Sequence, residues 1–406
     1  MNKKIDINNF LHVPYGTTVH GEEEISAVNK VLRTSTQMGS HVREFEEKIA
    51  AYFNKKYGIM VNSGSSALLL AAEIMDLPRN SEVITPALTF ATTVSCLVKN
   101  DLIPAFVDVE QGTYCINPSK IEAMISDKTK AVCIPNLIGN VAKWDQINKI
   151  CKKYDLKIIE DSADTLGASL NGQSTGSYSD ISITSFYGSH VINAAGNGGM
   201  LCVNSKDYAK RAKLLRSWGR TSSLFVESEA IENRFNVKID GFYYDTKFLF
   251  EAVGYNFEPS EIGAAFGLIQ LGKLKDNIKA RVLNFQAQYN FFRKYEDWFI
   301  LPRQMEKSHT GWLAFPLTIK DDAPFNRKEM QIFLEKRNIQ TRVIFTGNIT
   351  RQPGFINIQK REAEGAYPES DEVMRGGVLL ACHHGLTREM LDHVHSSFEI
   401  FANLYS

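Results

Sequence analysis

Along the first two thirds of the chain, segments with the apolar spacing of helices alternate with short apolar segments typical of strands. Residues 43–56 have the spacing of an amphipathic helix, and the apolar segment 66–75 has the length of a second helix. Short apolar runs bounded by turn residues predict strands at 58–62, 81–86, 104–109, 131–139 and 157–163. A helix from Ala91 to Val98 separates two of these runs. This alternation is typical of an α/β fold in which helices cover a mostly parallel sheet.

The pattern changes near Ala280. A long helix there is followed by apolar strands at 311–319 and 340–345, with a helix over 326–338 between them. We therefore expect a large domain over 43–280 and a smaller α+β lobe over 281–406. The segment 221–250 is polar and aromatic with weak periodicity, so we interpret it as an insertion over the surface. Residues 1–42 are expected to form an arm that packs on the small lobe.

Composition restricts the class of protein. The 406 residues suffice for two lobes, and Lys plus Arg equals Asp plus Glu at 46 each, so no basic excess favours nucleic acid or an anionic membrane. The N-terminus lacks the apolar segment of a signal peptide, and no apolar run reaches the roughly 20 residues of a membrane span. We expect a cytoplasmic protein.

The six cysteines are scattered without a CxxC pair, which argues against a metal cluster or a disulfide framework.

Three motifs carry candidate chemistry. NSGSSAL stands between a predicted strand and a helix, so Gly64 and Ser65 can offer N–H groups and a hydroxyl to a phosphate. Alone, such a turn is more often only a chain reversal. IIEDSADTLGA ends an apolar strand on Asp161, which can pair with a ring nitrogen or can simply cap a helix. SITSFYGSHVINAAGNGGM contains His190, and no lysine occurs between Lys157 and Lys206.

Taken together, the ordered motifs resemble the sugar aminotransferase and dehydratase family of fold-type-I pyridoxal phosphate proteins, over nearly the whole chain. The resemblance implies a large lobe with a mostly parallel mixed sheet and a small C-terminal α+β lobe. His190 stands where the family carries its cofactor-binding lysine. An imidazole can move protons but cannot form the covalent bond of that lysine. The resemblance thus implies pyridoxamine 5′-phosphate or pyridoxal 5′-phosphate held non-covalently, as in the dehydratase branch.

The same resemblance assigns the remaining cofactor contacts. Asp161 would pair with the pyridine nitrogen, Ser185 would help to hold the phosphate, and Phe90 would stack on the ring. In GYNFEPSEIGAAFGLIQL, Asn256 matches an asparagine that reaches from one subunit to the phosphate of the other, which implies a homodimer. Asp164 replaces a glutamine common in the aminotransferases and resembles the dehydratases.

Two positions depart from the family pattern. Asn197 stands where an acidic residue is common, and Glu258 stands where a basic residue is frequent. The stretch from His190 to Gly198 is also longer than usual.

RSWGR, TRVIFTGNITRQP and GWLAFP most resemble the nucleotide-linked 4-keto-6-deoxy-sugar 3-dehydratases. A diphosphate-linked sugar is anionic, and Arg220, Arg342 and Arg351 are candidate partners because guanidinium binds phosphate in a bidentate way. Surface arginines are usually only solvated.

Two dehydratase types compete. One acts on a CDP-linked sugar through an iron–sulfur cluster, yet Ser162 and Ala163 stand at its cysteine positions. The other, known on a GDP-linked sugar, needs no cluster and regenerates pyridoxamine phosphate from glutamate. We favour the second. His190 would then act as general base and afterwards as acid in the loss of the C3 hydroxyl.

Other interpretations remain open at this stage. The chain could be an aminotransferase in which histidine or an incoming base replaces the lysine. It could also be a non-catalytic relative that binds the cofactor or a sugar nucleotide. His383 and His384 are adjacent, and neighbouring residues of a strand point to opposite faces, so we assign no metal site.

Overall fold

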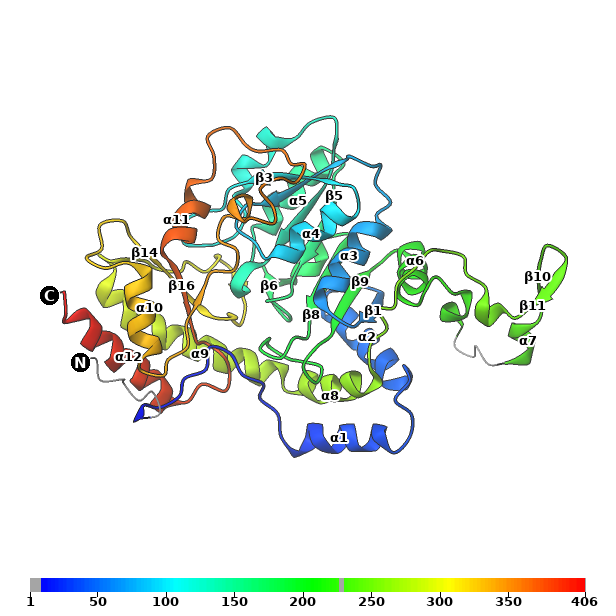
Figure 1. Ribbon diagram of the computed structural model, residues 1–406, viewed down its shortest axis with the longest axis horizontal. Coiled ribbons are helices and arrows are strands. Elements are labelled where there is room, and N and C mark those ends of the chain that lie inside the picture. The colour runs from blue at the N-terminus through cyan, green and yellow to red at the C-terminus, as the bar shows by residue number, and fades with distance from the viewer. Residues whose placement is uncertain (1–8, 226–229, 406) are drawn as a thin grey trace.

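A seven-stranded sheet forms the centre of the large lobe in the computed structural model, which describes residues 9–225 and 230–405 (Figure 1). The strand order is β1-β9-β8-β5-β4-β2-β3. Only β9 is antiparallel to its neighbours, and the other adjacent pairs are parallel. The predicted α/β fold with a mostly parallel sheet is therefore confirmed. The strands are β1 Tyr57–Val61, β2 Glu82–Pro86, β3 Ile103–Val107, β4 Thr129–Pro135, β5 Lys157–Asp161, β8 Ile181–Ser185 and β9 Gly199–Val203.

Side chains of this sheet alternate between two packed faces. In β4, Cys133 points into one apolar cluster, whereas Val132 and Ile134 point into another. Helices cover both faces, so the strands are apolar almost throughout, as parallel strands require. The covering helices are α2 Ser40–Tyr52, α3 Gly64–Ile74, α4 Ala91–Lys99, α5 Trp144–Lys153, α6 Lys206–Arg216 and α8 Glu261–Gly272. The short strands β6 Ser169–Leu170, β7 Gln173–Ser174 and β13 Ser308–His309 form a separate sheet at the edge of this lobe.

The small lobe has its own antiparallel sheet, in the order β12-β14-β16-β15. Its strands are β12 Phe299–Ile300, β14 Phe315–Ile319, β15 Arg342–Val343 and β16 Gly377–Leu380. Its helices are α10 Arg327–Glu335, α11 Pro368–Gly376 and α12 Arg388–Ala402. Stacked and edge-on aromatic rings fill its core, where Phe398 contacts Phe292 and Phe299.

Helix α9, Leu274–Phe292, joins the two lobes without a break. Its first half packs Leu274 and Ile278 into a cluster of the large lobe, and its second half packs Phe285 and Phe292 into the small-lobe core. The predicted boundary at 280/281 thus falls inside a continuous helix. One continuous helix therefore contributes to the cores of both lobes.

The N-terminal segment contacts both lobes, whereas the sequence analysis placed all of it on the small one. The amide of Val13 donates to Asn338 O at 2.9 Å, and Gln340 N donates back to Val13 O at 2.9 Å. Helix α1, Glu22–Leu32, instead packs along α8 (Figure 1). There the buried Glu24 accepts from Gln270 and Lys273, each at 2.7 Å. Residues 1–8 of this predicted arm lie outside the described residues.

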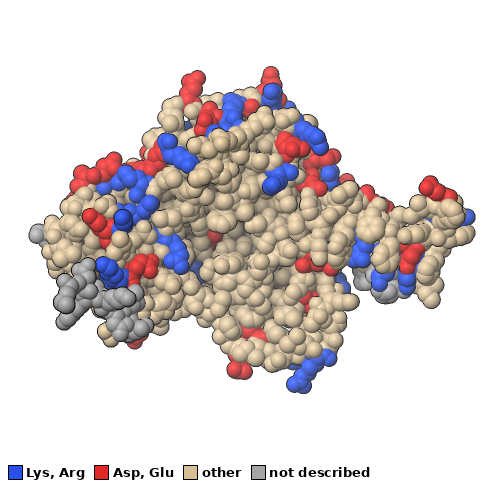
Figure 2. Space-filling model, in the orientation of Figure 1, with Lys and Arg blue, Asp and Glu red and all other residues tan. Residues whose placement is uncertain are grey.

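The interpreted insertion projects from the large lobe at the right of Figure 1. It contains α7 Ile231–Arg234 and a hairpin of β10 Val237–Ile239 with β11 Phe242–Tyr244, and its residues 226–229 lie outside the described part. On the face in Figure 2, positive and negative side chains mingle around the rim and the hollow centre is largely uncharged. No helix among the described residues has the length and apolarity that a bilayer crossing requires.

The aromatic core of the small lobe generates a stability prediction. Phe398 is fully buried, so Phe398→Ala should lower the free energy of unfolding by about 3–5 kcal/mol through lost burial and an unfilled cavity. Leu404→Ala is the control, because Leu404 is 65% exposed and should cost less than about 0.5 kcal/mol. Urea denaturation followed by tryptophan fluorescence measures both. Equal effects of the two substitutions would contradict the described core.

Candidate functional site

A cavity of about 360 Å³ lies at the carboxyl ends of the sheet strands, between the large lobe, the small lobe and the N-terminal arm. In open parallel sheets this edge is where ligands bind. β5 contributes Asp161 and β8 contributes Ser185, while Leu313 and Phe345 close the cavity from the small lobe. The sequence-predicted residues that line it are Gly64, Ser65, Phe90, Asp161, Asp164, Ser185 and His190. The motifs therefore converge on one cavity although they are far apart in the chain.

The first turn of α3 borders one side of this cavity. Ser63 caps the helix, accepting from Ser66 N at 3.1 Å. The helix comes so close to β8 that a Cβ at Gly64 would stand 2.7 Å from the Ser185 Cβ. Glycine is thus required for the close approach that puts the Ser185 hydroxyl beside the helix N-terminus. First-turn N–H groups carry partial positive charge, so this corner suits a phosphate.

Asp161 is a buried carboxylate with a face toward the cavity. Thr93 Oγ1 donates to its Oδ2 at 2.8 Å, and Ala163 N donates to its Oδ1 at 3.1 Å. Burial raises the pKa of Asp161 to about 6, although both hydrogen bonds lower it. Among the described residues no Lys, Arg or His forms an ion pair with it. A cationic ring nitrogen in the cavity would supply the missing partner, so Asp161 fits the pyridinium of a pyridoxal coenzyme.

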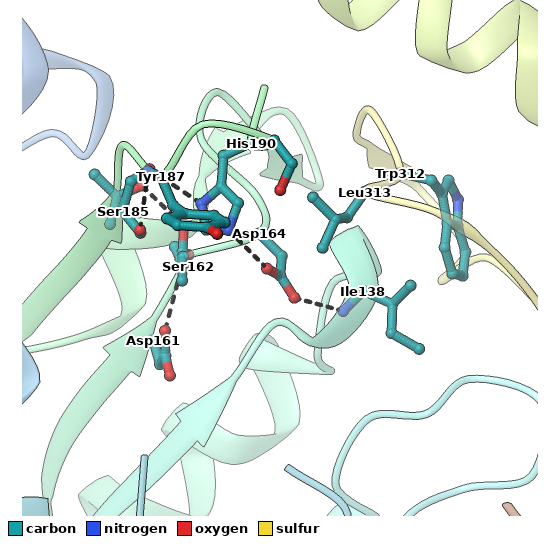
Figure 3. A network of polar contacts seen from close by, with 12 residues as sticks. Ile138, Asp161, Ser162, Asp164, Ser185, Tyr187, His190, Trp312 and Leu313 are labelled. Carbon is teal, nitrogen blue, oxygen red and sulfur yellow. Dashed lines mark hydrogen bonds and ion pairs between the residues drawn. The ribbon is translucent and has the colours of Figure 1, made fainter. Parts of the chain in front are cut away.

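His190 lies on the loop that follows β8. Its Nδ1 is 3.3 Å from Ser185 O, and since a carbonyl only accepts, this contact assigns the ring proton to Nδ1. The lone pair of Nε2 is then free, 3.9 Å from Asp164 Oδ1 (Figure 3). Burial lowers the pKa of His190 to about 4, the Ser185 carbonyl raises it, and the charge of Arg281 lowers it further. The imidazole is therefore neutral at pH 7 and able to accept a proton.

Asp164 faces His190 and is held from the other side. Its Oδ2 accepts from Ile138 N at 2.9 Å (Figure 3). Ile138 adopts a left-handed backbone with φ of 60°. A branched residue is strained there, and such strain is common at functional sites. Burial, followed by the charge of Asp161, raises the pKa of Asp164 to about 7. Burial thus favours the neutral forms of both Asp164 and His190, and we infer that they do not form a permanent ion pair.

No lysine is present among the described residues that line this cavity. Other lining residues were not singled out as site residues from the sequence, among them Tyr15, Asn136, Leu313 and Phe345. Of these, Leu313 and Phe345 lie within the quoted segments GWLAFP and TRVIFTGNITRQP. The rings of Phe345 and Phe90 pack edge to face, with their centres 5.8 Å apart. Tyr15 comes from the arm, and burial raises its pKa. Each belongs to a segment whose contact with the cavity exists only in the folded chain.

Four predicted binding residues are not among those that line this cavity. Asn256 is exposed and pairs its backbone with Ser217. Arg351 pairs with Asp371 on α11, and the Arg342 guanidinium lies 5.4 Å from the centre of the Tyr15 ring. Arg220 lies 4.2 Å from the Trp218 ring centre and lines a second, polar cavity of about 470 Å³. Their roles in binding stay predictions.

The two adjacent histidines are not in a strand, as the sequence analysis assumed. They follow β16, where turn geometry replaces the strand, and His383 donates from Nε2 to Pro14 O at 3.0 Å. Among the described residues no group of three His, Cys, Asp or Glu side chains is arranged to hold a metal ion. All six cysteines are buried free thiols.

Comparisons with known proteins bear on the fold and the family. The model of the DegT/DnrJ/EryC1/StrS aminotransferase family matches residues 18–399. The dTDP-4-dehydro-2,6-dideoxy-D-glucose 3-dehydratase of Saccharopolyspora spinosa is 34% identical over 402 residues, which are 96% of this chain and 86% of the relative. The dTDP-3-amino-3,6-dideoxy-alpha-D-galactopyranose transaminase of Aneurinibacillus thermoaerophilus is 30% identical over 91% of this chain and 92% of its own.

A solved structure of the E. coli GDP-4-keto-6-deoxy-D-mannose-3-dehydratase with bound hydrated PLP superposes with a TM-score of 0.86. It is 25% identical and covers 96% of this chain and 99% of its own. The fold is therefore that of the pyridoxal phosphate-dependent aminotransferases. The relatives include both dehydratases and transaminases.

The buried Asp164 carboxyl gives the coenzyme-free protein a specific pH dependence. Its pKa is about 7 in the folded chain against an ordinary 3.8, so the folded state holds the proton more tightly than the unfolded one. This contribution to stability is complete below about 3.8 and is lost as the pH rises through about 7. Asp164→Asn cannot ionise. Relative to wild type it should gain up to a few kcal/mol of unfolding free energy between pH 4 and pH 8.

Urea denaturation of both proteins across this pH range measures the gain. The control is Asp322→Asn, at an exposed aspartate, which should follow wild type throughout. A difference between Asp164→Asn and wild type that stays constant from pH 4 to pH 8 would show that Asp164 is not a desolvated carboxyl.

Proposed function

The chain belongs to the DegT/DnrJ/EryC1/StrS aminotransferase family, and we propose that it is a 3-dehydratase of a nucleotide-diphosphate-linked 4-keto-6-deoxy sugar. The coenzyme would be pyridoxamine 5′-phosphate, exchanging with pyridoxal 5′-phosphate without a covalent bond to the chain. One observation carries the proposal. A neutral imidazole, His190, lines the cavity, and no lysine does so among the described residues.

The cavity offers a contact for each part of such a coenzyme. The first turn of α3 at Gly64 and Ser65, with the Ser185 hydroxyl, would hold the phosphate. Asp161 would hold the protonated pyridine nitrogen, and Phe90 would lie against the ring. Asp164 and His190 would then lie near the reactive end. In a homodimer, Asn256 would complete the phosphate site of the other subunit, as the family resemblance implies.

When bound, pyridoxamine phosphate supplies an amine that condenses with the C4 ketone of the sugar and a ring that withdraws electrons. Asp161 would keep the ring nitrogen protonated, because a carboxylate beside it stabilises the charged form. His190 would accept the proton from C4′ on Nε2, and its low pKa keeps that lone pair available. The resulting imidazolium can donate this proton to the departing C3 hydroxyl. Asp164 Oδ1, 3.9 Å from Nε2, would stabilise this imidazolium when the carboxyl is ionised.

The reductant is proposed to be glutamate rather than an iron–sulfur cluster. Ser162 donates its hydroxyl to Glu160 Oε1 at 2.6 Å and accepts from Asn136 at 2.8 Å, so this position is part of a buried hydrogen-bond network. It holds no thiolate, and neither does Ala163 beside it. Glutamate oxidation returns the pyridoxal form to the amine. Each deoxygenated sugar should then be accompanied by one 2-oxoglutarate and one ammonia.

For the substrate we propose a sugar linked to a nucleoside diphosphate, since the compared relatives are named for dTDP- and GDP-linked sugars. Arg220, Arg342 and Arg351 remain the proposed partners of the diphosphate. A transaminase is the second candidate, because one relative of 30% identity has that activity in its name. An aminotransferase would release no ammonia, and its product would retain the C3 hydroxyl.

Product analysis distinguishes the two candidates. The protein is supplied with pyridoxal phosphate, glutamate and, in turn, the GDP-, CDP-, UDP- and dTDP-linked 4-keto-6-deoxy sugars. We expect at least one sugar to lose its C3 oxygen and keep its ketone, with ammonia and 2-oxoglutarate in equal amounts, measured by mass spectrometry and coupled assay. An amino sugar without ammonia would assign the protein to the transaminases. Turnover of none of the four would contradict both assignments.

Replacement of the imidazole by an amine tests the role of His190. His190→Lys should lower C3 elimination by at least about 100-fold, since general acid–base catalysis contributes about that much or more. The variant should also bind pyridoxal phosphate covalently and gain measurable transamination. The matched control is His309→Lys, at an exposed histidine in β13, which should keep wild-type activity. If His190→Lys retained full elimination, His190 would not be the base.

A further inference from the structure

Arg281 is a fully buried arginine in the middle of α9, and its partners are unusual. Its Nη1 donates to Trp312 O at 3.1 Å and to Leu313 O at 3.0 Å. Its Nη2 donates to Ser189 O at 3.2 Å and to His190 O at 3.1 Å. All four acceptors are backbone carbonyls, and among the described residues no carboxylate forms an ion pair with this guanidinium. A buried charge without a counter-ion is costly, which points to a role beyond packing.

Arg216, the other deeply buried arginine, has a carboxylate as its counter-ion. Arg216 pairs with Glu46 Oε1 at 2.6 Å and donates from the same nitrogen to Met60 O at 2.9 Å. Its charge is thus compensated in place. Burial lowers the pKa of Arg281 to about 10, so its guanidinium still stays charged at neutral pH. Four backbone carbonyls accept the hydrogen bonds of this guanidinium, and the nearby Asp164 raises its pKa.

These carbonyls connect both sides of the proton-transfer site. On one side Arg281 holds the backbone of the His190 loop. On the other it holds Leu313, whose N–H donates to Ile138 O at 2.8 Å. Ile138 N in turn donates to Asp164 Oδ2 at 2.9 Å (Figure 3). A continuous path of hydrogen bonds therefore runs from His190 through Arg281, Leu313 and Ile138 to Asp164.

We propose that Arg281 is a positioning residue that fixes the His190 imidazole against Asp164 by tying the His190 loop to the Trp312–Leu313 segment of the small lobe. The contact between the lobes and the placement of the base then depend on the same side chain. The planar fork of arginine can reach two pairs of carbonyls at once, which the three donors on the single nitrogen of lysine cannot reproduce. The inference rests on the proposed function only where turnover is measured.

Charge and geometry make separable contributions. The titratable groups around His190 are Asp164 and Asp161 from the end of β5, Arg281 from α9, Tyr187 from its own loop and Tyr15 from the arm. Of these, the cation of Arg281 disfavours the imidazolium and lowers the pKa of His190. Removal of the charge should therefore raise that pKa. Replacement of Arg281 by lysine should leave the pKa of His190 low, because the positive charge stays, but should lose the paired hydrogen bonds of the planar guanidinium.

The test uses Arg281→Met and Arg281→Lys, with Arg216→Lys as the matched buried control. NMR titration of the coenzyme-free protein reports the His190 imidazole without any reliance on catalysis. We expect Arg281→Met to raise the pKa of His190 by about one unit and Arg281→Lys to leave it near the wild-type value. Both should lower kcat for C3 elimination by about 100-fold, the cost of a base displaced by about 1 Å. Arg216→Lys should change neither quantity.

Three outcomes would overturn the proposal. One is an unchanged His190 titration in Arg281→Met, and another is wild-type kcat in Arg281→Lys. The third is an equal loss of kcat in Arg216→Lys, which would indicate a general effect of destabilisation. If Arg281→Met does not fold, Arg281→Lys still decides through kcat and the His190 titration. A wild-type protein that eliminates no hydroxyl would contradict the proposed function, whereas the NMR comparison would still test Arg281.

Discussion

Desolvation of three titratable side chains at one edge of the sheet is the constraint on which the site depends. Burial raises the pKa values of Asp161 and Asp164 and lowers the pKa of His190, so the cavity disfavours each charged form. A carboxyl that needs a cation and an imidazole that stays neutral are the two properties that proton transfer around a pyridine ring requires. Had these groups been exposed to water, their pKa values would be ordinary and the site would have no preference for such a coenzyme.

These side chains are desolvated because the small lobe and the N-terminal arm cover them, and not because they lie deep inside the large lobe. The parallel strands deliver Asp161 and Ser185 to the same edge, and the first turn of α3 follows β1 to that edge. The small lobe and the N-terminal arm then cover it with Leu313, Phe345 and Tyr15. Helix α9 packs into the cores of both lobes, so it connects the small-lobe side of the cavity to the large-lobe side.

The sequence predicted the parts of the site that local patterns encode. The strand–turn–helix at Gly64 and the strand end at Asp161 are recognisable because each motif is contiguous, and the absence of lysine around His190 can be read directly. The contacts of Arg281 could not be read, since its partner His190 lies 91 residues away and an arginine in a helix usually faces solvent. Tyr15 was missed for the same reason, because only the folded arm brings it to the cavity.

An imidazole, and no amine, is proposed to face the reactive carbon of the bound coenzyme. Borohydride reduction of the protein saturated with pyridoxal phosphate, followed by mass spectrometry of the intact chain and its peptides, tests this directly. We expect the mass of the chain to stay unchanged, with the coenzyme removed by dialysis. A stoichiometric phosphopyridoxyl adduct on any lysine of the chain would contradict the account.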